Sequence, residues 1–380
     1  MKALPKSPKS EKIGRRKNVM SRVYFKKADS SLKPNEISDY AKGLFDTLLK
    51  RETIQLNQEI PLKVHFGERG NTTFVKPQYC NGIIDYIENQ NKKACFIETN
   101  ILYGGERTTK ETHIKLAKEH GFTRIPVIIA DGEKGEDYYE VEINKKHFEK
   151  CKIGKEFSKY SQIIVVSHFT GQMLAGLAGA IKNLAMGFAS RGGKLAQHAK
   201  VIKPRIKNRA CDKCRLCEKR CAVGAITIAE KSYIDYEKCI SCAACNAICP
   251  KKAIKIILLR SIFNIFGDTF RERLTESAYA AQKDKQIIYV TFAMNITRGC
   301  DCEPKTMKPI VEDIGILAST DPVAIDQACY DMVRESGKKL RGSHMLKYAE
   351  EIGMGSRQYE IVKNDMPPSI VPPAKLEPPA

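Results

Sequence analysis

Eight of the fourteen cysteines lie in residues 211–250, and their spacing constrains that segment more than any other feature of the chain. They form two identical runs in which the cysteines are separated by two, two and three residues, and Pro250 closes the second run. Three close thiolates with a fourth directed to a neighbouring cluster are typical of paired cubane [4Fe–4S] clusters. With the usual crossing, one cluster would be bound by Cys211, Cys214, Cys217 and Cys249, and the other by Cys239, Cys242, Cys245 and Cys221.

Structural zinc and disulfide bonds are the alternatives for these cysteines. Zinc sites usually pair two CxxC units, and a third cysteine at the same interval leaves a spare thiol. Disulfides require an oxidising compartment, for which nothing else in the sequence argues. Ala222 follows the first run, where ferredoxins of this type usually carry proline, so the local turn departs from the pattern. We therefore expect two [4Fe–4S] clusters as cofactors.

The positive charge is concentrated in two stretches. The 380 residues carry a formal net charge of +20, and residues 1–27 and 191–220 account for nearly all of it. The first stretch reads as a disordered basic arm, either a solvated tail or a contact to a partner. The second leads directly into the first cysteine run and favours an acidic, soluble redox partner or an anionic substrate. Aromatic residues are scarce in both stretches, which disfavours nucleic-acid binding.

Residues 161–181 contain no formal charge and are long enough to suggest a membrane span. However, they hold several polar residues and glycines, with a β-branched run first and a helical pattern afterwards. We interpret them as a buried strand that leads into a helix. The sequence thus predicts a chain without a membrane span and a cytoplasmic location, in which the cysteines are reduced or bound to metal.

Strand-like and helix-like patterns alternate along the chain, which indicates an α/β fold with a mainly parallel sheet. Strands are expected at 22–28, 61–67, 94–100, 125–131, 138–143, 162–170, 286–296 and 314–319, and helices at 34–52, 76–90, 109–120, 177–198, 324–336 and 344–352. The cysteine-rich segment interrupts this alternation. The predicted organisation is a basic arm (1–21), one α/β domain in two parts (22–203 and 259–365), an inserted ferredoxin-type domain (204–258) and a Pro-rich tail (366–380).

The glycine-rich segment after the expected strand 162–170 is the first candidate site outside the cysteines. Free backbone amides at a helix start attract anions, and glycines at 171, 176 and 179 would let a ligand approach closely. The alternative is that the glycines only allow tight packing. The residues expected there are His168, in a catalytic role at the strand end, Gly171, Gly176 and Gly179 in binding, and Lys182 and Asn183, of which Lys182 is a second catalytic candidate.

Two further constellations follow later strands. Cys300 and Cys302 flank Asp301 and are expected either to bind a soft metal as an extra site, to act as a redox pair, or to remain reduced and buried. Asp321 precedes a proline and is a good N-cap for the next helix. Asp326 lies inside that helix without an evident structural role, so both aspartates are candidates for cofactor or ligand binding.

Several stretches together resemble the uncharacterised iron–sulfur centre proteins of the domain-of-unknown-function 362 family. They are KVHFGERGNTTFV (63–75), ETNILYGGERT (98–108), the glycine-rich stretch 167–194, CDC (300–302) and DIGILASTDPVAIDQACYD (313–331). The resemblance covers about residues 22–360 and implies a cytoplasmic redox protein of anaerobic type with an inserted ferredoxin module. The stretch from His168 to Gly187 is also similar to lactate-racemase-type proteins, in which a His and a Lys serve the cofactor and substrate site.

The leading hypothesis is an oxidoreductase that passes electrons through two [4Fe–4S] clusters to a small anionic substrate in an α/β crevice near His168 and Lys182. Another hypothesis is a non-catalytic, ferredoxin-like electron carrier or assembly factor that docks a partner protein. The sequence leaves the choice between enzyme and carrier open.

Overall fold

The computed structural model describes residues 20–198, 204–221, 223–239, 244–256 and 260–363. The expected basic arm lies outside these residues except for its last two positions, and the expected Pro-rich tail lies wholly outside them. No described helix has the length and apolarity needed to cross a lipid bilayer. Residues 162–168 instead form a buried strand, as the sequence analysis expected.

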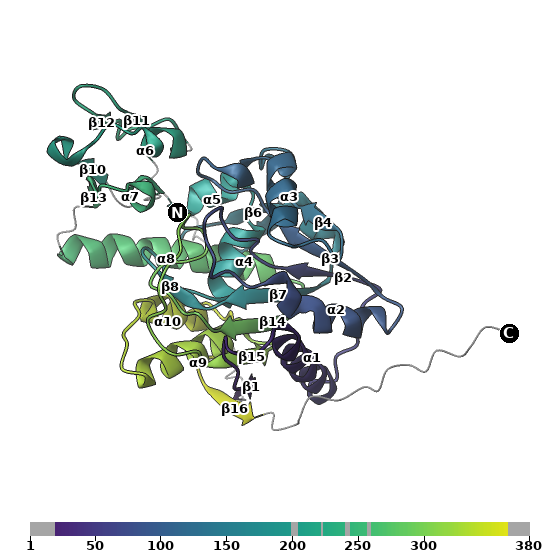
Figure 1. Cartoon of the computed structure of the whole chain (residues 1–380). Helices are drawn as coiled ribbons and strands as arrows, with labels where there is room; N and C mark the ends of the chain where they lie inside the picture. The colour runs from purple at the N-terminus through teal and green to yellow at the C-terminus, as the bar shows by residue number, and fades with distance from the viewer. Residues whose placement is uncertain (1–19, 199–203, 222, 240–243, 257–259, 364–380) are drawn as a thin grey trace, which may run out of the picture.

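An eight-stranded, mainly parallel sheet forms the centre of the fold (Figure 1). Only one of its strands runs antiparallel to both neighbours, and it is the strand formed by Gly315–Ser319. The predicted mixed α/β fold with a mainly parallel sheet is therefore confirmed. In spatial order the strands are β16 (Tyr359–Lys363), β1 (Ser21–Lys26), β15 (Gly315–Ser319), β14 (Gln286–Ala293), β7 (Gln162–His168), β2 (Glu59–Lys63), β3 (Lys93–Glu98) and β4 (Val127–Ile129).

Helices cover both faces of the sheet, which explains why its central strands are apolar at nearly every position. Successive residues of β7 point to opposite faces: Ile163 and Val165 enter one hydrophobic core, and Ile164 and Val166 enter the other. The first core includes residues of α4 (Ala180–Phe188), α8 (Arg260–Gln282), α9 (Pro322–Glu335) and α10 (Ser343–Glu351), and the second includes residues of α1 (Pro34–Arg51), α2 (Asn81–Glu88) and α3 (Lys110–Glu119).

The glycine-rich region differs from the expected single helix at 177–198. The chain first forms a small hairpin, β8 (Thr170–Gln172) with β9 (Gly176–Ala178), and only then α4 and α5 (Arg191–His198). The helices are separated because Ala189 has an extended backbone, φ −69° and ψ 138°. A second hairpin, β5 (Tyr138–Glu142) with β6 (Lys150–Gly154), lies outside the central sheet.

The longest described helix, α8, has no counterpart among the expected elements. It packs against α4 and α10 although it carries buried polar residues at the contact. Glu276, for example, is fully buried and accepts a hydrogen bond from Tyr348 Oη at 2.6 Å. Because these polar residues have partners, they can be buried in the interior. They also interrupt the apolar periodicity by which a buried helix is predicted from sequence.

The cysteine-rich segment forms a small unit with its own hydrophobic cluster, seen at the upper left of Figure 1. Along the chain the order strand, helix, strand occurs twice, and the four strands form two short antiparallel sheets. The elements are β10 (Pro204–Ile206) paired with β13 (Ile254–Ile256), β11 (Ile226–Thr227) paired with β12 (Tyr233–Ile234), α6 (Leu216–Arg220) and α7 (Ala244–Ile248).

Candidate functional site

A cavity of about 160 Å³ opens at the carboxyl ends of β7, β2 and β3. Parallel strands collect ligands at this edge because backbone and side-chain groups from several strand ends meet there. Lys63, Glu98 and His168 are the last residues of their strands, and all three line the cavity. Of the residues proposed from the sequence, His168, Gly179, Lys182, Asn183, Cys300 and Cys302 line it together.

His168 is held by an acceptor on each ring nitrogen. Its Nδ1 lies 2.9 Å from Oδ2 of Asp301, and its Nε2 lies 2.7 Å from the backbone oxygen of Met294. Burial alone would lower the pKa of His168, but the Asp301 carboxylate and the Met294 carbonyl raise it above its ordinary value. Both nitrogens therefore donate, and the imidazolium form is favoured. His168 cannot accept a proton in this arrangement, so it does not fit the role of a general base.

Lys182 is the charged cavity-lining side chain that forms no hydrogen bond or salt bridge with any described residue. Burial lowers the pKa of its amine to about 8, and the nearby charges of Arg107 and Lys63 act in the same direction. Asp301 and Glu98 oppose this shift without cancelling it. The amine can thus hold an anion as an ammonium, or exchange a proton or react as a neutral amine near pH 8.

The polar wall beside Lys182 is formed by Lys63, which is fully buried. Its Nζ donates to Glu98 Oε2 at 3.0 Å and to Asn183 Oδ1 at 2.6 Å. The Asn183 amide group in turn donates to the backbone oxygen of Val166 and to Ser167 Oγ. Asn183 was expected to grip a ligand, but the structure corrects this: its side chain holds Lys63 and strand β7 in place.

A second buried ion pair joins Arg107, which also lines the cavity, to Glu68 at 3.2 Å. The Arg107 guanidinium also contacts His65 Nε2 at 3.0 Å and donates to Tyr103 Oη at 3.1 Å. Burial, together with the charge of Arg107, lowers the pKa of His65 well below its usual value, so this imidazole is neutral. Lys194 completes the wall and donates to three oxygen atoms, those of Thr99 Oγ1, Asn100 O and Ala189 O.

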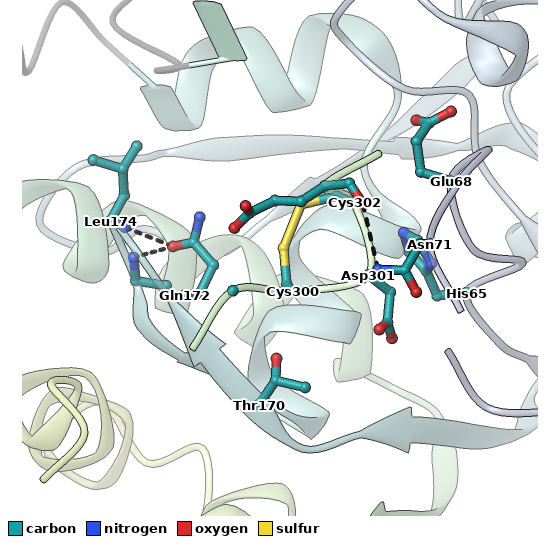
Figure 2. The surroundings of a disulfide bond; sticks show 12 residues. His65, Glu68, Asn71, Thr170, Gln172, Leu174, Cys300, Asp301 and Cys302 are labelled. Carbon is teal, nitrogen blue, oxygen red and sulfur yellow. Dashed lines mark hydrogen bonds between the residues drawn. A yellow bond between two sulfur atoms is a disulfide. The ribbon is translucent and has the colours of Figure 1, made fainter. Parts of the chain in front are cut away.

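Cys300 and Cys302 are joined by a disulfide bond that lies against the cavity. Figure 2 shows it between Gln172 on one side and His65 and Asn71 on the other. In this form neither sulfur is a thiolate, so the extra metal site considered from the sequence is not formed, and reduced cysteines are not what the structure holds.

The three glycines proposed for binding serve close packing instead. A Cβ atom on Gly171 would lie 2.5 Å from the backbone oxygen of Arg298, and one on Gly176 would lie 2.2 Å from that of Arg341. At Gly179 it would lie 2.2 Å from Asp326 Oδ1. Tight packing, the alternative explanation of these glycines, is therefore what the structure shows.

Asp326 occupies the place that the sequence analysis assigned to an anionic ligand. Its two carboxylate oxygens accept the backbone amides of Ala180 and Ile181, at 2.7 and 2.9 Å, at the start of α4. Burial raises the pKa of Asp326 to about 7. Asp321 caps α9 as expected and also binds Ser21 and Ser356, so neither aspartate is available to a cofactor.

The cysteine runs show the same local bonding twice. The Sγ atom of Cys221 accepts the amide of Ala225 at 3.2 Å, and that of Cys249 accepts the amide of Ala253 at 3.2 Å. Burial raises the pKa of Cys217 to about 11, and the nearby thiol groups of Cys249 and Cys211 add to the shift. Cys242 lies outside the described residues, and among the residues that are described no three His, Cys, Asp or Glu side chains converge on a metal position.

Arg220, the residue before Cys221, joins the cysteine-rich unit to the cavity. Its guanidinium lies 3.9 Å from the centre of the Tyr103 ring and 3.6 Å from Glu68, and it donates to the backbone oxygen of Cys302 at 3.3 Å. Its own backbone oxygen accepts the amide of Gly104 at 2.9 Å. Two predicted sites that are distant in sequence are therefore in direct contact.

Sequence reasoning did not assign roles to Lys63, Glu98, Arg107, Lys194, Asp301 or Arg220. A usable signal existed for the first two, because each is a charged residue that ends an apolar strand. No comparable signal existed for Arg220, since one more arginine in a basic stretch does not stand out.

The class of this protein is defined by three features. They are a mainly parallel sheet covered by helices, a cysteine-rich unit between α5 and α8, and a polar cavity at the carboxyl ends of the strands. The model of the family described as "Domain of unknown function (DUF362)" matches residues 60–331. The match covers well over half of the chain, and the protein belongs to this family.

Other similarities are partial. The chain is 53% identical over 47 residues to a component of the ion-translocating oxidoreductase complex of Methanosarcina acetivorans, which is 12% of this chain and 18% of that protein. Among solved structures, the lactate racemase apoprotein of Thermoanaerobacterium thermosaccharolyticum aligns over 83% of this chain and 57% of its own, with 12% identity and a TM-score of 0.42. A Thermotoga maritima protein aligns over 82% and 61%, with 11% identity and a TM-score of 0.39. The chain thus spans less than two thirds of each of these proteins.

Proposed function

We propose that this protein is an iron–sulfur redox protein in which residues 204–258 bind two [4Fe–4S] clusters. The observation that carries the proposal is the pair of identical cysteine runs within one unit, where Cys217 lies close enough to Cys211 and Cys249 for their thiols to affect its pKa. That proximity suits the crossed ligand sets, since Cys249 comes from the other run. The amide-to-sulfur bonds at Cys221 and Cys249 suit a thiolate that ligates iron.

The clusters would supply single electrons, and this chain's own residues would hold the molecule that receives them. Among the described cations of the cavity, Lys63, Arg107 and His168 are matched by carboxylates. Lys194 is held by three neutral oxygen atoms. Lys182 is the cation without a hydrogen bond or salt bridge to a described residue. Lys182 is thus the cation that a ligand could pair with directly, which favours a small anion. His168 fixes Asp301, and Lys63 fixes Asn183, so these residues keep the cavity shaped rather than react.

A soluble donor with an acidic surface fits the basic side of the cysteine-rich unit. Six cations lie exposed around the first cysteine run: Arg205, Lys207, Arg209, Lys213, Arg215 and Lys219. Opposite charges speed the encounter of two proteins, and salt screens the effect.

The test of cluster binding is the composition of the anaerobically purified protein. We expect about eight iron atoms and eight acid-labile sulfides per chain. Cys214→Ala and Cys249→Ala should each remove the same electron paramagnetic resonance signal, because the crossing assigns both to one cluster. Cys95→Ser removes a cysteine outside the runs and is the control. Protein that contains zinc and no sulfide would refute the proposal.

The cavity is tested separately, with inorganic phosphate and small carboxylates in a thermal-shift assay. We expect at least one of them to stabilise the wild type and to have no effect on Lys182→Met. An electron carrier without a substrate site would show no stabilisation by any of these anions, while its clusters and electron transfer remained intact.

A further inference from the structure

The position of the disulfide between Cys300 and Cys302 indicates a chemical role for it rather than a role in stabilising the fold. Both residues line the cavity that contains Lys182, and Cys300 is 4% exposed. A disulfide stabilises a fold mainly by restricting the unfolded chain, and the effect is smallest for short loops. This one closes a loop of only three residues.

The loop is already fixed by hydrogen bonds that do not involve sulfur. The backbone oxygen of Asp301 accepts the Glu68 amide at 3.1 Å, and that of Cys300 accepts the Glu303 amide at 3.0 Å. Tyr103 Oη donates to the backbone oxygen of Cys302 at 3.2 Å. The loop can therefore keep its place whether the sulfur atoms are bonded to each other or reduced.

Arg220 provides a short route from the cysteine-rich unit to this loop. It is covalently adjacent to Cys221, a proposed cluster ligand, and its side chain donates directly to the backbone oxygen of Cys302. The path between the two cysteines thus consists of one residue and one hydrogen bond of 3.3 Å. Arg220 is also 9% exposed, so water does not surround this route.

We propose that Cys300 and Cys302 form a redox-active disulfide–dithiol pair that accepts electrons from the clusters of the neighbouring unit. The proposal rests on the proposed function, because it needs the clusters as the reductant. In the step, the sulfur–sulfur bond breaks and takes up two electrons and two protons, which yields two thiols. Each reduced cluster would supply one electron and be oxidised by one electron, and the two protons would come from solvent through the cavity. The reduced pair would thus store two electrons, received one at a time, at the wall of the ligand-binding cavity.

The experiment counts thiols in the full chain after anaerobic reconstitution. The protein is treated with reduced methyl viologen, a one-electron reductant, then alkylated with iodoacetamide and digested with trypsin. The peptide of residues 299–305, GCDCEPK, contains both cysteines and no others. We expect it to change from unlabelled to doubly alkylated. The same chain stripped of iron should stay unlabelled with viologen and become labelled with dithiothreitol.

Two variants distinguish a loss of electron transfer through Arg220 from a loss of the folded, iron-binding unit. Arg220→Met keeps the proposed ligands and should lose most of the rate at which the peptide becomes labelled, while the iron content stays at the wild-type level. Cys95→Ser should behave as the wild type.

Each contrary result has a distinct meaning. A chain that contains iron, whose clusters are reduced and whose peptide stays unlabelled, would overturn this inference and leave the proposed function intact. A peptide that is already doubly alkylated before any reductant is added would also overturn it. A chain that binds no iron would overturn the proposed function together with the inference, and the iron assay identifies that case.

Discussion

The side chains of His168 and Asp301 form a buried ion pair at 2.9 Å although they are 133 residues apart in sequence. The two side chains are 4% and 8% exposed. The pair connects the end of β7 to the loop that carries Cys300 and Cys302. It is one of several contacts at the cavity between residues that precede the cysteine-rich unit and residues that follow it.

Removing one partner of this pair should destabilise the protein strongly. We expect His168→Gln to lower the free energy of unfolding by about 3–5 kcal/mol, because it leaves the Asp301 charge buried without its partner. Since the folded state raises the pKa of His168, the stabilisation is fully present below the unfolded pKa and disappears as pH rises through the folded pKa. Urea unfolding at a series of pH values measures both. If the effects of His168→Gln and Asp301→Asn simply added in the double variant at every pH, the two side chains would not interact and the ion pair would be refuted.

Lys182 should react at a lower pH than lysines that are exposed to solvent. Its pKa of about 8 means that a substantial fraction is neutral at pH 8, whereas ordinary lysines are almost fully protonated there. We expect reductive methylation to label Lys182 with a midpoint near pH 8, read by the carbon-13 signal of the methyl groups. Lys182→Met identifies the signal by its loss. A midpoint above pH 10 would show that the amine is solvated.

Asp326 should make stability depend on pH in the opposite sense to an ordinary salt-bridged carboxylate. Its pKa is raised from 3.8 to about 7, so between these values the folded state holds more protons than the unfolded state, and stability falls as pH rises. Asp326→Asn should flatten this slope, and relative to the wild type it should gain on the order of 4 kcal/mol between pH 3 and pH 8. Parallel slopes in chemical denaturation would contradict the assignment.

Gly176 should tolerate no side chain. Its φ of +92° is unfavourable for alanine, and the added Cβ would meet the backbone of Arg341. Gly337 has a similar φ of +76° with open space around it, so Gly337→Ala measures the cost of φ alone. We expect Gly176→Ala to destabilise the protein by about 1–3 kcal/mol more than this control, as overpacking does. Equal thermal midpoints for the two variants would refute the packing role.

The sequence placed the cavity because parallel strands bring their carboxyl ends to one edge, and His168 follows such a strand. Lys182 and the Cys300–Cys302 loop were assigned to the same crevice for this reason. The anion site at the start of α4 was wrong because Asp326, 146 residues from Ala180, fills it, and no local pattern shows a partner at that distance.

Other features needed three-dimensional contacts as well. Asn183 was assigned to a ligand from its place beside Lys182 after the glycine-rich stretch. The sequence does not show that its partners are Lys63 and the backbone of Val166, which lie in strands of the central sheet. Helix α8 was missed because its buried glutamates look like a solvent-exposed pattern until their partners are known. The crossed ligand sets of the two clusters remain a prediction.

The contact of Arg220 with Tyr103 makes the cysteine-rich unit and the cavity energetically interdependent. Tyr103 forms part of the cavity wall, and the Arg220 guanidinium stacks on its ring. A ligand that displaces this ring must also break the stacking. By thermodynamic reciprocity, any change that moves Arg220 alters the affinity for that ligand by the same factor as the ligand alters the placement of Arg220. Ligand binding in the cavity would then change the position of the cysteine-rich unit, and a change in that position would change ligand binding.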